Sequence, residues 1–146
     1  MIYIGCDHGG FALKQEILKY IKEDLAEEAE DLGCYDTSSV DYPDYAEKVC
    51  KKVVAENAKG ILICGTGIGI SIAANKIAGI RCALCSEPFS AEMTRRHNNA
   101  NVLAMGGRTV GSELAKSIVK VFLTTEFEGG RHQKRLDKIS ALEAAK

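Results

Sequence analysis

The chain has 146 residues, which is enough for one well-packed domain and too few for two of ordinary size. Its 19 basic and 20 acidic side chains leave a formal net charge of -1, and no long basic stripe indicates a nucleic-acid partner. No apolar run reaches the roughly 18 residues of a membrane helix, and the opening residues lack the basic flank and cleavage region of a signal peptide, so we expect a cytoplasmic protein with no membrane partner.

Strand-like and helical segments alternate from the beginning of the chain. Residues 1–6 read as an apolar strand, and apolar side chains at helical spacing then predict a helix that carries Leu13, Ile17, Ile21 and Leu25. A weaker strand is expected around residues 27–32. Pro43 suits the first position of a second helix, because its fixed backbone angle is already helical.

The alternation continues through the second half of the chain. Residues 60–65 form a continuous apolar strand, and a helix is expected from about residue 69 to residue 77. Residues 80–85 form another strand, which leads to a helix that begins at Pro88 and is capped by Glu87. Residues 101–106 form a fifth strand, and its helix carries Leu114, Ile118, Val121 and Phe122.

A final helix is expected from about Arg131, with Ile139 and Leu142 as its packing side. Strands that alternate with helices, several of them apolar throughout, favour a parallel sheet covered on both faces. We therefore predict one domain over residues 1–146, a three-layer α/β/α sandwich with about five parallel strands. Ligands of such sheets bind beyond the carboxyl ends of the strands.

Six cysteines are present, and most of them fall within apolar strands or on the apolar face of a helix. Free cysteine behaves as a small hydrophobic residue in such positions. Cys82 and Cys85 form a C-x-x-C pattern inside a strand, where residues three apart point to opposite faces, about 10 Å apart. This separation is too long for a disulfide, and no second C-x-x-C completes a zinc site, so we expect no metal.

Cys64 differs because it ends a buried strand and opens the glycine-rich loop "CGTGIG". The loop is either a tight strand-to-helix turn or a cradle of backbone N–H groups for an anion or enediolate. It is neither a P-loop nor a dinucleotide fingerprint. A thiol against a helix N-terminus is expected to have a lowered pKa, and a base beside a hole for an oxyanion suits proton abstraction next to a carbonyl.

Basic side chains near helix ends could reach the same edge of the sheet and are further candidates: His97, Arg131, His132 and Arg135. His97 lies near a helix C-terminus, where the helix dipole favours a protonated imidazole, and is either a proton donor or an ordinary surface histidine. Arg131 and Arg135 are four residues apart in the last helix and so share one face. They form either a phosphate clamp or a solvated basic turn.

Five segments in their order along the chain are similar to the type B ribose-5-phosphate isomerases, a family that also contains allose-6-phosphate and galactose-6-phosphate isomerases. The segments are "GCDHGGFALK", "DYPDYA", "ILICGTGIGISIAANK", "IRCALCSEPFSAEMTRRHNNANVLAMGGR" and "FEGGRHQKR". The resemblance runs from about residue 2 to residue 140. It implies a Rossmann-like fold and an aldose–ketose isomerase that uses no metal or cofactor and works as a homodimer or a dimer of dimers.

The resemblance also assigns roles to residues. It makes Cys64 the base that moves a proton between C1 and C2 through a cis-enediolate, and His97 the acid that opens the furanose ring, with Asp7 as its partner. Thr66 and the N–H groups of the loop would hold the enediolate oxygens. The remaining sugar and phosphate contacts that it implies are Asp7, His8, Tyr42, Gly65, Thr66, Gly67, Ile68, Gly69, Asn98, Arg108, Arg131 and Arg135. It further implies that His97, Asn98 and Arg108 reach the site from a second chain.

Three functions are therefore open at this stage. The first is isomerisation of ribose 5-phosphate and ribulose 5-phosphate, and the second is isomerisation of a hexose 6-phosphate such as allose 6-phosphate. The third, a nucleotide-binding module without enzymatic activity, would need the glycine loop but not the thiol.

Overall fold

The computed structural model describes residues 1–145, so residue 146 of the predicted domain lies outside the described residues. Its five strands are all parallel and form one sheet in the order β2-β1-β3-β5-β4. The strands are β1 (Ile2–Cys6), β2 (Ala29–Asp31), β3 (Lys59–Cys64), β4 (Cys82–Leu84) and β5 (Val102–Gly106). The predicted parallel sheet is confirmed.

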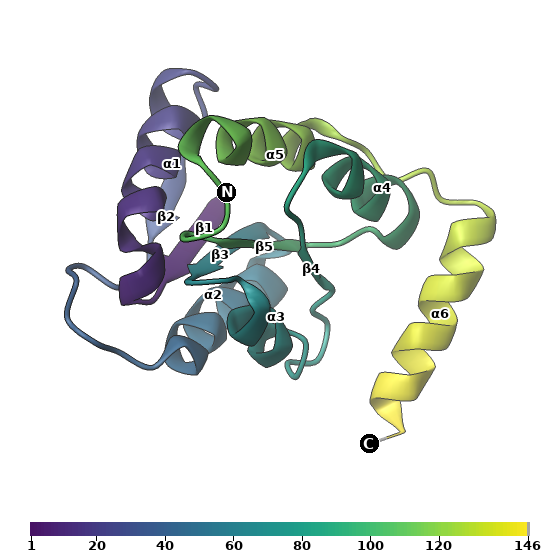
Figure 1. Cartoon of the computed structure of the whole chain (residues 1–146). Helices are drawn as coiled ribbons and strands as arrows, with labels where there is room; N and C mark the ends of the chain where they lie inside the picture. The colour runs from purple at the N-terminus through teal and green to yellow at the C-terminus, as the bar shows by residue number, and fades with distance from the viewer. Residues whose placement is uncertain (146) are drawn as a thin grey trace.

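Helices cover both faces of the sheet and give three layers (Figure 1). The helices are α1 (Phe11–Glu23), α2 (Tyr42–Glu56), α3 (Ile68–Ala74), α4 (Pro88–Asn98), α5 (Ser112–Thr124) and α6 (Arg131–Ala144), with a short 3₁₀ turn, η1 (His8–Gly10). One apolar cluster joins the sheet to α1, α4 and α5, and a second joins it to α2 and α3. None of the helices in residues 1–145 is long and apolar enough to cross a membrane.

The central strand β3 shows why residues 61–64 are all apolar. Successive side chains of a strand point to opposite faces. Ile61 and Ile63 accordingly enter the first cluster, whereas Leu62 and Cys64 enter the second. A strand that is buried on both faces needs an apolar side chain at every position.

Several boundaries differ from the sequence prediction. The second strand covers only residues 29–31, and α3 ends at Ala74 and not near residue 77. The cap before α4 is confirmed, because the Glu87 carboxylate accepts hydrogen bonds from the Ser90 backbone N–H.

The predicted packing side of the last helix is wrong within this chain. Ile139 is 47% exposed and Leu142 is 71% exposed, and the buried side chains of α6 are His132 and Leu136. Helix α6 stands beside the body of the molecule (Figure 1). Ile139 and Leu142 line a groove of about 490 Å³ between α6 and that body. The apolar face predicted from the sequence therefore exists, but this chain does not cover it.

Candidate active site

The crevice between the carboxyl ends of β1 and β3 is the switch point of the sheet. Helix α1 follows β1 onto one face, and α3 follows β3 onto the other, so the two connecting loops diverge. Such a divergence opens a crevice in which ligands of parallel sheets bind. The loop after β5, the strand next to β3, borders the same edge.

Three loops meet in this crevice through their backbones. A Cβ on Gly9 would lie 3.1 Å from the backbone nitrogen of Gly65, and a Cβ on Gly107 would lie 2.5 Å from the carbonyl oxygen of Gly9. The contact at Gly107 leaves no room for a side chain, and the one at Gly9 leaves very little. The glycines therefore allow the three loops to approach closely enough to form one surface.

Cys64 lies at the start of the glycine loop, with only 5% of its surface exposed. Its Sγ accepts a hydrogen bond of 3.1 Å from the backbone N–H of Gly67. Gly67 has a φ of +80°, a left-handed conformation that favours glycine and turns the loop into α3. The Thr66 hydroxyl accepts a bond of 3.2 Å from the N–H of Ile68, which fixes this side chain in the same loop.

Most of the other thiols are held in their protonated form. Burial raises the pKa of Cys6 and of Cys50 to about 12, and that of Cys85 to about 11. Burial also raises the pKa of Cys82. All six cysteines are free, as the sequence indicated. Cys64 is the thiol that the fold brings to the glycine loop.

Polar side chains from two further elements complete the crevice. Oδ1 of Asp7 accepts hydrogen bonds from the backbone N–H groups of Gly9, at 2.9 Å, and Gly10, at 3.2 Å, which fixes the carboxylate above β1. Nδ1 of His8 accepts a bond of 3.2 Å from the Val40 N–H. The Tyr42 ring packs over Gly69, where an added Cβ would lie 2.6 Å from it. A surface pocket joins Asp7, His8 and Tyr42.

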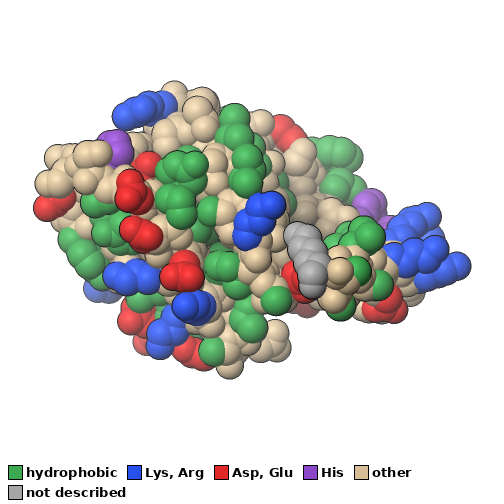
Figure 2. Space-filling model, turned by 90° about the horizontal axis from the view of Figure 1, so that it is seen from below, with side chains coloured by type: hydrophobic (Ala, Val, Ile, Leu, Met, Phe, Trp, Pro, Cys, Tyr) green, Lys and Arg blue, Asp and Glu red, His purple; other side chains and the backbone are tan. Residues whose placement is uncertain are grey.

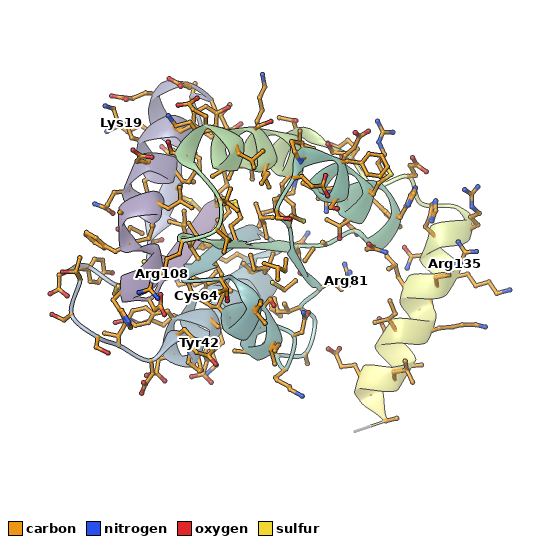
Figure 3. All side chains as sticks on the ribbon, viewed as in Figure 1. Lys19, Tyr42, Cys64, Arg81, Arg108 and Arg135 are labelled. Atoms are coloured by element: carbon orange, nitrogen blue, oxygen red, sulfur yellow. The ribbon has the colours of Figure 1, made fainter. Side chains whose placement is uncertain are left out.

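Arg108 lies in the same crevice of the same chain. Its backbone N–H donates to the Gly65 carbonyl at 2.9 Å, and its guanidinium reaches over Gly65, where an added Cβ would lie 3.3 Å from Nη1. Figure 3 shows Arg108, Cys64 and Tyr42 gathered at this edge. We expected Arg108 to reach this crevice from a second chain, and that expectation is wrong. Because β5 pairs directly with β3, the loop after β5 brings Arg108 to the Cys64 loop of the same chain.

The remaining predicted residues lie elsewhere in the chain. Helix α4 starts after the carboxyl end of β4 and returns toward the start of β5, so its last residues, His97 and Asn98, lie at the amino edge of the sheet. The Arg81 side chain donates to the carbonyl of Asn98 at 3.0 Å and steadies this end of the helix. Arg131 and Arg135 lie on the first turns of α6, which contacts α4.

The residues near Cys64 and the residues on α4 and α6 lie in different parts of the molecule. Arg135 lies on α6, on the opposite side of the molecule from Cys64 and Arg108 (Figure 3). Basic side chains also gather at the end of the molecule that α6 forms (Figure 2). The predicted site residues thus fall into two separate groups, the thiol half (Asp7, His8, Tyr42, Cys64–Gly69 and Arg108) and the histidine half (His97, Asn98, Arg131 and Arg135).

Comparison with known proteins identifies the chain. Residues 2–139 match the model of the Ribose/Galactose Isomerase family. The chain belongs to this family. It is 54% identical to the ribose-5-phosphate isomerase B of Escherichia coli, with 97% of this chain and 95% of the relative aligned.

Solved structures agree with this family assignment. The ribose-5-phosphate isomerase B of Clostridium thermocellum superposes with a TM-score of 0.96 at 50% identity, covering 99% of this chain and 97% of that one. The type B ribose 5-phosphate isomerase of Leishmania infantum gives 0.93 at 46% identity, covering 99% and 96%. The predicted family and Rossmann-like α/β fold are confirmed. The nucleotide-binding alternative finds no support among these isomerases.

Two further residues lie beside His97. His132 stacks on His97 with 4.3 Å between ring centroids, and Glu128 lies beside both rings. His132 is a candidate from the sequence, whereas Glu128 was missed. Glu128 precedes α6 and is separated from His132 by Gly129 and Gly130, with φ of +70° and +56°, so helical spacing could not have paired the two residues.

His97, Glu128 and His132 also have the residue types of a metal site, and one ligand atom of each lies within 4.8 Å of the others. The two imidazole planes are only 15° apart, however. Lone pairs of nearly parallel rings do not converge on one point, as ligands of a tetrahedral metal must. The observed geometry fits stacking better than metal coordination.

Proposed function

We propose that this isomerase interconverts D-ribose 5-phosphate and D-ribulose 5-phosphate, with Cys64 as the base. The observation that carries the proposal is the position of the Cys64 thiol, which accepts the Gly67 N–H at the start of a glycine loop that packs closely against the loop after Asp7. Relatives that align over nearly their whole length are named ribose-5-phosphate isomerases. Free cysteines are typical of a reducing compartment, so we place the enzyme in the cytoplasm.

The proton transfer uses groups of the thiol half. The Cys64 thiolate takes the proton from C2 of the open-chain aldose, and the electron pair moves through C1 to its carbonyl oxygen, which gives a cis-enediolate. The Thr66 hydroxyl and backbone N–H groups of Gly65 to Gly69 stabilise the oxygen that gains charge. The same proton then returns to C1, while the hydroxyl proton of O2 passes to O1, and the ketose results.

Ring opening must come before this step, because ribose 5-phosphate is mainly a furanose. His97 gives a proton to the ring oxygen as the bond from C1 to that oxygen breaks. Asp7 takes the proton of the C1 hydroxyl, whose electron pair forms the carbonyl. The two backbone N–H groups that donate to the Asp7 carboxylate both bind Oδ1. We therefore assign the proton from the sugar to Oδ2.

The phosphate needs cations, which the two halves supply together. Arg131 and Arg135 share one face of α6 and suit a phosphate clamp. His8, Tyr42 and Arg108 border the crevice from the thiol half. Asn98 completes the contacts to the sugar.

A second copy of the chain must bring the histidine half to the thiol half, since one chain holds them at opposite edges of the sheet. A two-fold dimer would build two complete sites in this way. Exposed apolar side chains on α3 and α6 support an interface: Ile68, Ile72, Ile139 and Leu142 are each 47–71% exposed. The assembly is a homodimer or a dimer of such dimers.

The direct test is isomerisation of D-ribose 5-phosphate by the purified protein in EDTA, with D-allose 6-phosphate assayed in parallel. We expect strong turnover of the pentose phosphate without metal. Turnover of the hexose phosphate alone would transfer the same mechanism to the alternative substrate. Turnover of neither would contradict the proposal.

Cys64→Ala tests the base. Its turnover should fall by about 10²–10⁴-fold while the sugar phosphate still binds, because only proton abstraction is lost. Cys82→Ala is a matched control, since this thiol lies outside the crevice. A Cys64→Ala enzyme with most of its turnover would disprove the assignment.

A further inference from the structure

His97 shares its environment with a second, buried imidazole. The His97 and His132 rings stack with centroids 4.3 Å apart and planes 15° apart. His97 is at the end of α4, and His132 is in the first turn of α6, so the stack joins two elements. The His97 side chain is 40% exposed, whereas that of His132 is 7% exposed. One ring therefore faces solvent, and the other forms its floor.

Glu128 places one carboxylate oxygen beside both rings. Its Oε1 is 3.3 Å from Nε2 of His132 and 4.0 Å from Nε2 of His97. Among residues 1–145, Nε2 of His132 is a buried polar atom without a hydrogen-bond partner. Such an atom is costly unless a small shift completes its bond, and the Glu128 oxygen is the group within reach.

The carboxylate is held in this position by α4. The Glu128 backbone N–H donates to the Arg96 carbonyl at 3.0 Å, and its Oε2 lies 3.4 Å from Nη1 of Arg96. Arg96 is in turn held by Glu92 at 2.7 Å. Because Arg96 binds Oε2, Oε1 remains turned toward the two histidines.

Exposure separates the roles of the two rings. The His132 ring is buried where α4 and α6 meet, whereas the His97 ring is 40% exposed. The exposed ring of His97 is the one that a substrate can reach.

We propose that Glu128 and His132 are positioning residues that hold the His97 ring for furanose opening. His132 fixes the plane of the ring by stacking, and the Glu128 carboxylate beside both Nε2 atoms fixes how the rings are turned within that plane. This inference rests on the proposed function, in which His97 protonates the ring oxygen. Neither residue is required for proton transfer at Cys64.

Proton exchange at C1 of ribulose 5-phosphate separates these roles. Ribulose 5-phosphate cannot form a furanose, because its C5 oxygen carries the phosphate, so its enediolate forms without a ring step. Isomerisation includes ring opening in one direction and closure in the other, and the equilibrium constant makes forward and reverse kcat/KM fall together. A defect in the opening acid therefore slows isomerisation in both directions and spares exchange of the C1 proton of ribulose 5-phosphate with solvent.

The experiment measures kcat/KM for isomerisation of ribose 5-phosphate, and the rate of deuterium incorporation from D2O at C1 of ribulose 5-phosphate, for Glu128→Gln and His132→Phe. Glu126→Gln is the control, a carboxylate of the same segment, and His97→Asn is the reference. We expect Glu128→Gln and His132→Phe to lower kcat/KM for isomerisation by about 10- to 100-fold, with the exchange rate changed less than about threefold. Glu126→Gln should change neither quantity.

The reference variant separates the possible failures. If His97→Asn lowers isomerisation and spares C1 exchange, and Glu128→Gln and His132→Phe do not, the inference is overturned and the role of His97 stands. An equal loss of isomerisation and exchange in Glu128→Gln and His132→Phe would mean a structural role and would also overturn it. If His97→Asn itself does not separate the two rates, the ring-opening role in the proposed function fails, and this inference fails with it.

Discussion

Six thiols of one chain differ in what surrounds their sulfur atoms, and this difference separates Cys64 from the rest. Cys6 and Cys50 are fully buried, and burial raises the pKa of each to about 12. Cys64 is also largely buried, but its sulfur faces a backbone N–H donor at a crevice. A buried thiol without such a setting stays protonated and unreactive.

Alkylation should therefore be selective for Cys64. At pH 8, iodoacetamide should modify one thiol per chain, Cys64, in parallel with loss of activity, and a sugar phosphate should protect it. Raised pKa values keep Cys6, Cys50 and Cys85 protonated until the pH approaches about 11 to 12. Peptide mass mapping identifies the site. Early modification of Cys6 or Cys50 in the folded protein would contradict this account.

At the scale of elements, glycines let the helix after β1 approach β3. A Cβ on Gly10, at the N-terminus of α1, would overlap the carbonyl oxygen of Ile63. The position of α1 on the sheet thus depends on the absence of a side chain. The same approach brings the Asp7 loop to the Cys64 loop.

Gly10→Ala should consequently lower the free energy of unfolding by at least about 3 kcal/mol, because the clash is with rigid backbone. Gly111→Ala is the matched control. It also precedes a helix, but its φ is -69° and an added Cβ meets nothing within 4 Å among the described residues. It should change stability by less than about 1 kcal/mol. Urea denaturation measures both, and equal effects would refute the steric argument.

The sequence predicted the individual strands and helices of this fold better than it predicted which of them lie side by side. Periodicity and caps placed the strands and helices, because these signals are local. The order of the strands was not predictable, since any pairing buries the same apolar residues. The family resemblance assigned Arg108 to a second chain. Because β5 pairs with β3, the loop after β5 brings Arg108 into the crevice of its own chain, and the sequence does not reveal that pairing. Glu128 was missed because its role depends on α4 and α6 coming together.

At the scale of the molecule, the exposed apolar face of α6 indicates a surface made for another chain. Ile139 and Leu142 are three residues apart and share one helix face, as the sequence pattern predicted. The pattern could not reveal which molecule covers that face. A dimer would explain both this exposure and the division of the site into halves.

Leu142→Asp should weaken the dimer by at least about tenfold, because an interface must then desolvate a carboxylate. When Leu142→Asp is diluted, its specific activity should begin to fall at a higher protein concentration than that of the wild type. Ser140→Asp, on the opposite face of α6, is the control and should behave like the wild type. Analytical ultracentrifugation measures the dissociation. An unchanged dimer in Leu142→Asp would place the interface elsewhere.

The most direct test of the shared site combines two inactive variants. Cys64→Ala damages the thiol half, and His97→Asn damages the histidine half. After complete subunit exchange at equal amounts, half of the dimers are mixed and each holds one intact site, so about a quarter of the wild-type activity with ribose 5-phosphate should return. No recovery, with exchange demonstrated by native mass spectrometry, would mean that each chain holds its own complete site and would contradict the account.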